Sequence, residues 1–241
     1  RTDQVQHVVR LKDSAQEPIC QRAYRYGPTQ RRFINESIDQ MLEHDIIEPS
    51  FSSWSSPLVV VFKKCGKMRF CVDLRKVNQA CCPDVHGLPR IEDLIQDIGN
   101  KTPKYITCLD MFSGFWNIPI DEKSRDLFTF ANFGRSYRFK VLPFGFVGAP
   151  STMQRLVTGV MAGLKPETAS LYVDDLCIGS PTWEKHLEEL EMVLKAFQKA
   201  NLTFNPQKCH FARKEVTYLG YNINEHGIKP DPKNVEVIKN F

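Results

Sequence analysis

Residues 171–178 read Leu-Tyr-Val-Asp-Asp-Leu-Cys-Ile, which places two adjacent carboxylates inside an apolar run typical of a strand. Neighbouring side chains of a straight strand point to opposite faces, so Asp174 and Asp175 could not both serve one site there. A tight hairpin at the pair removes that conflict, because Asp tolerates turn conformations better than its apolar neighbours. The pair then either binds a cation, since an unpaired buried charge is costly, or belongs to an ordinary surface hairpin.

The pattern around this hairpin predicts an α+β fold. Single helices alternate with β hairpins, which does not suit a doubly wound parallel sheet. Helices are expected over about 29–45, 91–98, 149–164 and 182–200, with a last one after Pro232. Strands are expected at 58–62, 67–73, 105–110, 127–132 and 136–141, with four short ones between 202 and 223. Residues 76–88 read as irregular.

Two helices have predicted details that the structure can test. Thr29 is the expected N-cap of the first helix, and Ser180 or Thr182 that of the helix over 182–200. The apolar residues of the latter helix predict its buried face, which consists of Trp183, Leu187, Leu190, Val193, Leu194 and Phe197.

Composition is that of an ordinary globular protein. Of the 241 residues, 42% are apolar and 25% charged, and the formal net charge is +4. This balance is compatible with a polyanionic partner but does not by itself indicate one. The eight cysteines include no C-x-x-C pair, which disfavours a zinc site and suggests free thiols in a reducing compartment. No segment is long and apolar enough to span a membrane. The chain reads as a piece of a longer protein.

A third carboxylate stands in a matching position. Asp110 ends an apolar strand 64 residues before Asp174, and on adjacent strands the two could converge. Three carboxylates can hold a pair of Mg²⁺ ions about 3.5–4 Å apart for in-line phosphoryl transfer. The alternative for Asp110 is a simple strand-end cap. Lys63 and Lys64, at the tip of a β hairpin, would suit a triphosphate, or form only a solvated edge.

Five short motifs follow one another along the chain. They are Arg69-Phe-Cys-Val-Asp-Leu-Arg75, Leu109-Asp-Met-Phe-Ser-Gly-Phe115, Leu142-Pro-Phe-Gly-Phe146 with Ala149-Pro150, Tyr172-Val-Asp-Asp175 and Tyr218-Leu-Gly220. In this order and spacing they resemble the motif set of reverse transcriptases. Trp54-Ser-Ser-Pro57 and Gly227-Ile-Lys-Pro-Asp-Pro232 resemble the gypsy-like branch of LTR retrotransposons and their retroviral relatives.

The resemblance implies a catalytic triad of Asp110, Asp174 and Asp175. It implies an RNA- and DNA-directed DNA polymerase that transfers a nucleotide from a dNTP to a primer 3′-hydroxyl with two Mg²⁺ ions, for which Mn²⁺ can substitute. Asp110 and Asp174 are the stronger expected ligands, with the carbonyl of Met111 assisting, and Asp175 is expected to support them.

Further roles follow from the same resemblance. Arg69, with Lys63 or Lys64, would hold the β- and γ-phosphates. Phe115 occupies the position of the steric gate against a ribose 2′-hydroxyl, or is a core aromatic. Phe144 stands where retroviral enzymes often have Gln, so a sugar hydrogen bond from that side chain is absent.

The residues implied to contact nucleic acid are Tyr172, Val173, Gln154, Tyr218, Leu219 and Gly220, of which the last three resemble the primer grip. Gln154 could instead have a buried structural role. Lys208 resembles a general acid for pyrophosphate, or is a plain surface lysine.

The implied architecture is the fingers and palm of a right-hand polymerase, with an antiparallel palm sheet backed by helices and the thumb absent or only begun. Residues 1–28 would be an extended lead-in, 29–84 and 119–148 the fingers, 85–118 and 149–226 the palm, and 227–241 the start of a connection toward the thumb.

Implied partners are a template with primer, dNTPs, and the protease, RNase H and integrase domains of a Pol polyprotein, in cytoplasmic retroelement particles and without a membrane. The isolated chain is expected to be weakly active or inactive. A non-catalytic nucleic-acid-binding module and a two-metal nuclease are the rival functions.

Overall fold

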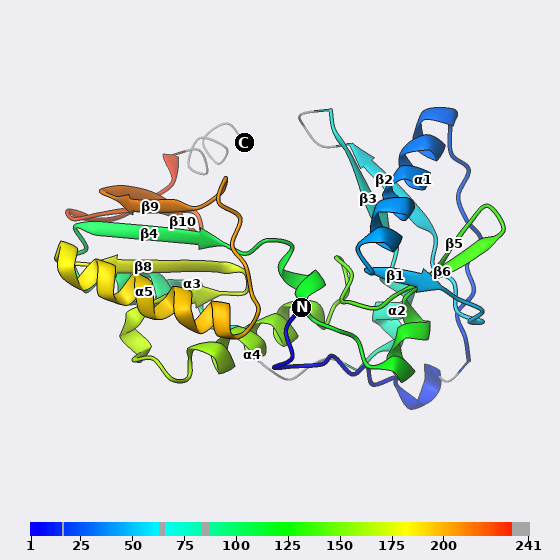
Figure 1. Cartoon of the computed structure of the whole chain (residues 1–241), viewed down its shortest axis with the longest axis horizontal. Helices are drawn as coiled ribbons and strands as arrows, with labels where there is room; N and C mark the ends of the chain where they lie inside the picture. The colour runs from blue at the N-terminus through cyan, green and yellow to red at the C-terminus, as the bar shows by residue number, and fades with distance from the viewer. Residues whose placement is uncertain (16, 63–65, 83–86, 233–241) are drawn as a thin grey trace. The chain divides into compact units, whose positions relative to one another are not determined.

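The computed structural model describes residues 1–15, 17–62, 66–82 and 87–232, and the chain divides into two compact units (Figure 1). Unit 1 comprises Arg1–Val85 and Phe115–Ala149, and unit 2 comprises His86–Gly114 and Pro150–Phe241. Each unit is therefore built from two separate segments of sequence.

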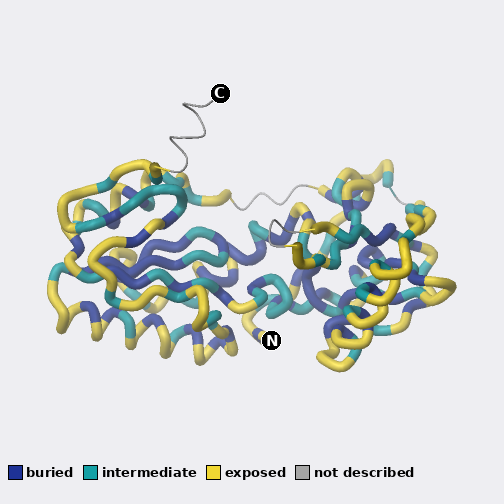
Figure 2. The backbone as a smooth tube through the Cα atoms, turned by 90° about the horizontal axis from the view of Figure 1, so that it is seen from above, coloured by how far each residue is buried: buried dark blue, intermediate teal, exposed yellow. Residues whose placement is uncertain are grey.

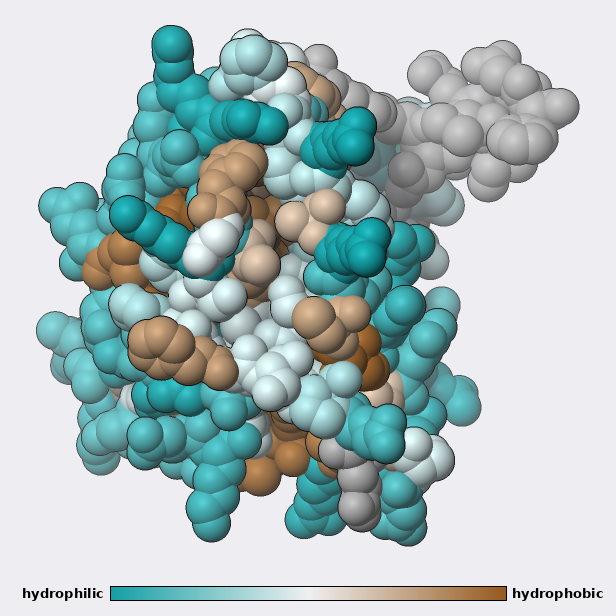
Figure 3. All heavy atoms as spheres, turned by 90° about the vertical axis from the view of Figure 1, so that its right-hand side faces the viewer, coloured by the Kyte–Doolittle hydropathy of each residue, from teal (hydrophilic) through white to brown (hydrophobic). Residues whose placement is uncertain are grey.

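Unit 1 combines two small antiparallel sheets with helices. One sheet has the order β1-β6-β5 and the other is the hairpin β2–β3. The elements of this unit are η1 (Asp13–Ala15), α1 (Pro28–Glu43), β1 (Ile47–Pro49), β2 (Leu58–Phe62), β3 (Met68–Val72), α2 (Arg75–Ala80), η3 (Glu122–Phe128), β5 (Thr129–Asn132) and β6 (Arg135–Phe139). On the described part of the face drawn in Figure 3, apolar side chains form small separate groups among hydrophilic ones.

Two details of unit 1 differ from the sequence prediction. Helix α1 begins at Pro28 with Gly27 as N-cap, because proline suits the first helical turn and the Gln30 side chain accepts a hydrogen bond from the Gly27 N–H at 3.1 Å. Thr29 is therefore not the cap. The segment expected to be irregular contains α2, whose Val77 and Ala80 are buried. Tertiary packing rather than a capping signal makes this short helix.

Unit 2 is centred on a four-stranded antiparallel sheet of order β7-β8-β4-β9. In Figure 2 the strands of this unit form a largely buried interior. Its elements are α3 (Ile91–Gly99), β4 (Tyr105–Asp110), α4 (Ala149–Met161), η4 (Pro166–Thr168), β7 (Ser170–Tyr172), β8 (Asp175–Ser180), α5 (Trp183–Lys199), β9 (His210–Arg213), β10 (Glu215–Tyr218), β11 (Tyr221–Asn224) and β12 (Gly227–Pro230). The short element η2 (Gly114–Asn117) links the units.

Successive side chains of β4 point to opposite faces of the sheet and therefore pack in two different layers. Ile106 joins an apolar core with Ile95 and Ile98 of α3. Thr107 points the other way and contacts His186 of α5. Asp110, an even-numbered residue of the same strand, shares the face of Ile106.

The last strand that the structure describes, β12, lies in the segment expected to begin a connection toward the thumb. It pairs with β11 in a three-stranded antiparallel sheet with β10. The helix expected after Pro232 lies outside the described residues. Among the helices that the structure describes, none is both long and apolar enough to cross a membrane.

The buried face of α5 only partly matches the one that its apolar residues predict, since Val193 and Phe197 are buried as expected but Trp183, Leu187 and Leu194 are exposed. Thr182 caps the helix as expected, but the buried residues are His186, Glu189, Val193 and Phe197. His186 and Glu189, the two polar residues of this face, belong to a network of hydrogen bonds, so they keep hydrogen-bond partners although they are buried.

One arrangement of protons satisfies every member of this network. The Thr107 hydroxyl donates to His186 Nε2 (2.7 Å), His186 Nδ1–H donates to Ser180 Oγ (3.0 Å), and the Ser180 hydroxyl donates to Glu189 (2.5 Å). The Ala212 N–H completes it by donating to Thr107 Oγ1 at 3.0 Å. Burial lowers the pKa of His186, which fits the neutral ring that this arrangement needs.

Ser180→Ala should lower the free energy of unfolding by about 2 kcal/mol, because it leaves His186 Nδ1 and Glu189 without their shared buried partner. Urea unfolding followed by circular dichroism measures this. Ser53→Ala, at an exposed position, is the control and should change stability by less than about 0.5 kcal/mol. Equal stabilities of the two variants would contradict the network.

Candidate active site

The two adjacent carboxylates lie where the hairpin β7–β8 turns. Tyr172 pairs with Asp175, and Val173 and Asp174 form the turn between them. The predicted hairpin is confirmed, but the residue in the left-handed region is Val173, with φ 56°, and not an aspartate. A β-branched residue there costs about 1–3 kcal/mol and persists only where surrounding contacts fix it.

Gln154 of α4 supplies one such contact. Its side-chain oxygen accepts a hydrogen bond from the Val173 N–H at 2.9 Å, and the side chain is only 6% exposed. This geometry favours the buried structural role for Gln154 over a template contact.

Strand pairing brings the third carboxylate to the same place. Asp110 lies directly opposite Asp175 in the antiparallel pair β4–β8, so both side chains project from one face of the sheet. The Met111 N–H donates to the carbonyl of Asp174 at 3.2 Å, which ties the end of β4 to the turn. The Met111 carbonyl remains an expected ligand.

Gly114 allows the chain after β4 to pass beside this turn. A Cβ atom at Gly114 would lie 2.9 Å from the Met153 methyl carbon and 3.6 Å from Asp174 Cβ. An alanine there would press on the end of the Met153 side chain and would make an ordinary van der Waals contact with Asp174.

The ammonium group of Lys208 lies against the Asp110 carboxylate, where a bound metal cation would otherwise lie. The Lys208 ammonium lies 3.0 Å from each Asp110 carboxylate oxygen. The Asn205 N–H donates to the Asp110 carbonyl at 2.8 Å, and the Lys208 N–H donates to the carbonyl of Asn205. Segment 205–209 therefore holds both the backbone and the side chain of Asp110. Sequence analysis singled out Lys208 but missed Asn205, for which an Asn-Pro turn is the only signal.

Asp110, Asp175 and Lys208 line a hollow of about 270 Å³ in unit 2. Its lining residues are Cys108, Leu109, Asp110, Asp175, Leu176, Lys208, His210, Thr217, Tyr218 and Leu219.

The pKa values of Asp174 and Asp175 are both raised, which indicates that the site carries too little positive charge for its carboxylates. Burial, and then the charges of Asp174 and Asp110, raise the pKa of the Asp175 carboxyl to about 6. Burial also raises the pKa of Asp174, and Asp110 adds to that rise. Lys208 opposes both effects but does not cancel them. Carboxylates that repel one another in a partly desolvated place are stabilised by a cation.

The donor set fits a hard divalent cation, although it is not preassembled. Among the residues that the structure describes, no three His, Cys, Asp or Glu side chains come close enough to hold a metal as they stand. Asp110 and Asp175 share a face and offer only oxygen, which Mg²⁺ prefers, and a cation would take the place of the Lys208 ammonium.

Tyr218 of β10 ties the hairpin β7–β8 in place through its hydroxyl group. Its hydroxyl lies 3.2 Å from the Asp175 carbonyl and 3.3 Å from that of Ser170, and its side chain is buried. Burial raises the pKa of the phenol, so it stays a donor. Leu219 and Gly220 follow with φ of 48° and 84°, the signs required at both centres of a two-residue hairpin turn.

Unit 1 gathers the predicted substrate residues into a separate cluster. The Arg69 guanidinium lies 5.2 Å from the centre of the Phe144 ring, and this ring meets Phe115 edge-on at 5.5 Å. Arg69 is exposed and has no carboxylate partner among the described residues. Asn78 holds the turn beside Phe144 through the Gly145 carbonyl (2.9 Å) and the Val147 N–H (3.0 Å). The predicted Lys63 and Lys64 lie outside the described residues.

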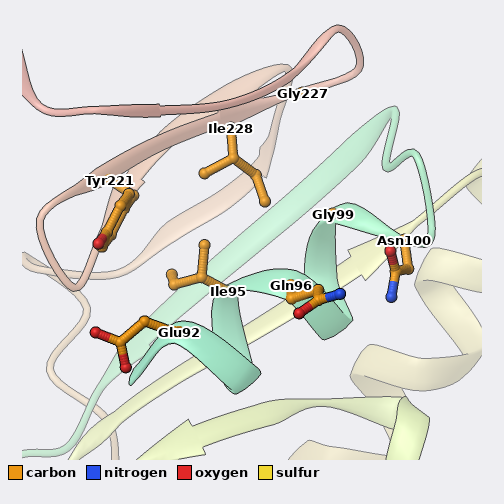
Figure 4. A pocket seen from close by; sticks show the side chains of 8 residues that line it. All are labelled: Glu92, Ile95, Gln96, Gly99, Asn100, Tyr221, Gly227 and Ile228. Carbon is orange, nitrogen blue, oxygen red and sulfur yellow. The ribbon is translucent and has the colours of Figure 1, made fainter. Parts of the chain in front are cut away.

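A second hollow of unit 2, of about 310 Å³, lies between α3 and the β11–β12 hairpin. Figure 4 shows Ile95 and Ile228 pointing toward each other across it. Its only acidic lining residue is Glu92, so it lacks the paired carboxylates of the first hollow.

The chain was compared with known proteins. The family model described as reverse transcriptase (RNA-dependent DNA polymerase) matches residues 61–223. The chain belongs to the reverse transcriptase family. It is 38% identical, over 97% of its length, to a Pol polyprotein from the Drosophila melanogaster transposon 412, and 33% identical to that from the transposon gypsy. It covers 19% and 22% of those two proteins.

The chain is also similar in fold to solved structures of a reverse transcriptase. The foamy viral protease-reverse transcriptase in complex with RNA/DNA hybrid matches 92% of this chain with a TM-score of 0.83 at 26% identity, over 30% of that chain. The same protein in complex with dsDNA matches 98% with a TM-score of 0.84, over 50% of that chain. These matches confirm the predicted α+β reverse transcriptase fold.

Asp175→Asn should stabilise the metal-free reverse transcriptase at pH 8 by about 1 kcal/mol after solvent screening, and less at pH 5. Folding raises the pKa of Asp175 from 3.8 to about 6, so the folded state binds more protons in this window. The contribution of Asp175 to the free energy of unfolding therefore falls as the pH rises. Urea unfolding in EDTA measures it, and a gain that does not change with pH would contradict the shift.

Lys208→Gln should bind Mn²⁺ about two- to fivefold more tightly, because the metal no longer displaces an ammonium from Asp110. Titration followed by electron paramagnetic resonance measures the free metal without any catalysis. Lys208→Arg keeps the cation and should bind like wild type, as should Lys199→Gln, a control at an exposed position of α5. Unchanged or weaker binding by Lys208→Gln would show that the lysine does not compete.

Proposed function

We propose that this chain is the reverse transcriptase domain of a retroelement Pol polyprotein, and that it synthesises DNA on RNA and DNA templates. One observation carries the proposal: the register of β4 and β8 sets Asp110 opposite Asp175, with Asp174 in the adjoining turn. Three carboxylates at one strand end, deficient in positive charge, suit two-metal nucleotidyl transfer.

In this proposal Asp110, Asp174 and Asp175 hold two Mg²⁺ ions, for which Mn²⁺ can substitute, and the Met111 carbonyl assists. When bound, the metals would activate the primer 3′-hydroxyl and neutralise charge on the attacked and leaving oxygens. The protein itself fixes where the carboxylates stand. Gln154 and Tyr218 hold the backbone of the hairpin through hydrogen bonds, so only the carboxylate side chains and Lys208 would have to move when the metals bind.

Arg69 would bind phosphate oxygens of the incoming dNTP, because a guanidinium matches two of them at once. Its place over Phe144 keeps the planar group oriented. Lys63 or Lys64 would add charge, and Phe115 would exclude a ribose 2′-hydroxyl. Lys208, once released from Asp110, would be free to protonate the leaving pyrophosphate.

We assign the fingers to unit 1 and the palm to unit 2. The turn at Leu219 and Gly220 would contact the primer, with Tyr172 and Val173 beside its end. The proposed partners are a template with primer, dNTPs, and the protease, RNase H and integrase domains of the polyprotein. The complexes with RNA/DNA hybrid and dsDNA in the foamy viral structures support the nucleic-acid partner. Cytoplasmic particles of the element are the proposed location.

In a longer Pol protein that contains this domain together with a thumb, Asp174→Asn should reduce primer extension about a thousandfold, because it removes a negative ligand for the metals. Extension of a labelled primer on RNA and DNA templates with Mg²⁺ or Mn²⁺ measures this. Asp97→Asn, on the exposed side of α3, is the matched control and should extend like wild type.

Template–primer binding by the longer wild-type protein without any metal-dependent extension would indicate a non-catalytic binding module instead. Shortening of the primer or template would indicate a nuclease.

A further inference from the structure

Helix α5 carries a row of apolar residues that its own unit covers only in part. Trp183, Leu187 and Leu194 are 43%, 46% and 38% exposed, and Leu190 between them is half-buried. We call these four residues the α5 stripe. Helix α5 packs on β8 and β4, and Figure 1 shows its other side facing the viewer.

The inner face of α5 is only partly apolar, because two polar residues are buried there beside Val193 and Phe197. His186 and Glu189, which are polar, point into the unit and need a network of partners there. Three large apolar residues of the α5 stripe meanwhile face solvent. A buried polar pair and an exposed apolar row on one helix mark a surface with another purpose.

The spacing of the α5 stripe is that of a helix-pairing seam. Its members follow one another at intervals of four, three and four residues, which are the a and d positions of a heptad repeat. Together they run along about 16 Å of the helix, enough for three turns of a partner helix. Thr182 caps the start of α5, and Trp183 packs edge-on against Tyr105 at 5.3 Å, so the row is held in place.

The charges beside the α5 stripe indicate the chemistry of that partner. Glu184 and Glu191 flank it on the solvent side, with Glu188 next to them. Lys195 is paired with Glu191 at 2.6 Å. Glu184 and Glu188 have no ion-pair partner among the residues that the structure describes, so the edge of the stripe that α5 itself forms is acidic. Lys214 lies 4.0 Å from the centre of the Tyr105 ring, beside Trp183, so this acidic character is confined to the α5 edge.

An acidic rim discriminates among possible occupants. A second copy of α5 would bring its own glutamates against these, and nucleic acid or an anionic membrane would be repelled as well. A helix with basic residues beside its apolar seam would bury the α5 stripe and pair with Glu184 and Glu188.

We propose that the α5 stripe is the docking site for an amphipathic helix of a partner protein, with a leucine-rich seam flanked by Lys or Arg. This inference does not depend on polymerase activity, and its test uses none. It adds to the catalytic unit a protein-binding surface on the opposite layer of the sheet from Asp110.

Two synthetic 21-residue helical peptides serve as probes. Both carry Leu at every a and d position, and one has Lys and the other Glu at e and g. Fluorescence anisotropy of the labelled peptides should show binding of the Lys peptide to the wild-type chain and at least tenfold weaker binding of the Glu peptide. The double variant Leu187→Ser with Leu194→Ser should lose at least tenfold in affinity for the Lys peptide.

Two further variants distinguish the contribution of the apolar α5 stripe from that of the neighbouring glutamates. Met192→Ser alters a residue that is 37% exposed but outside the α5 stripe, and it should bind like wild type. The double variant Glu184→Lys with Glu188→Lys should reverse the preference between peptides. All substitutions are at exposed positions, and unchanged thermal midpoints confirm that the fold is intact.

Failure of both peptides to bind, or equal binding of both, would overturn the proposal. Sedimentation velocity over a range of protein concentrations gives a further outcome. A dimer that forms with rising concentration and is lost in the Leu187→Ser, Leu194→Ser variant would assign the surface to a second copy and equally overturn it.

Discussion

The antiparallel pairing of β4 with β8 is the interaction on which the site depends. Its register sets Asp110 opposite Asp175, and a shift by one residue would turn one of the two carboxylates to the other face. The same pairing places Thr107 and Ser180 on the layer of α5, where both join the buried network. One ladder of hydrogen bonds therefore positions the acids on one face and anchors the supporting helix on the other.

Two energetically unfavourable features lie at the end of the β4–β8 pair. Val173 takes a backbone conformation that suits glycine, and three carboxylates share a partly buried place. Neither would persist alone. Gln154 and Tyr218 fix the turn from two sides, while Lys208 neutralises Asp110. Strain and repulsion of this kind are typical of functional sites, because the same arrangement becomes favourable when substrate and cations bind.

Helix α5 shows how one element can serve two interfaces. Its inner face is partly polar and is satisfied by hydrogen bonds that only this packing supplies, so it specifies where the helix lies on the sheet. The apolar residues of the α5 stripe are left on the flank of the helix, beside Glu184 and Glu188, while Val193 and Phe197 are buried. The division follows from the 3.6-residue period, which puts His186 and Glu189 on a different side from Leu187 and Leu194.

Much of this protein was determined by local sequence. The strand periodicity, the hairpin at Asp174 and Asp175 and the helix over Ile91–Gly99 could be predicted, because each depends on neighbours within a few residues. The motifs also identified the carboxylates that the sheet brings together. The short helix α2 was missed, because packing of Val77 and Ala80 makes it rather than a capping signal.

Only the tertiary structure decided that Val173 bears the strain, that Asp175 is the direct neighbour of Asp110, and that Lys208 lies on Asp110. It also decided which side of α5 is buried. These outcomes depend on register and on partners distant in sequence, which hydrophobic periodicity does not encode.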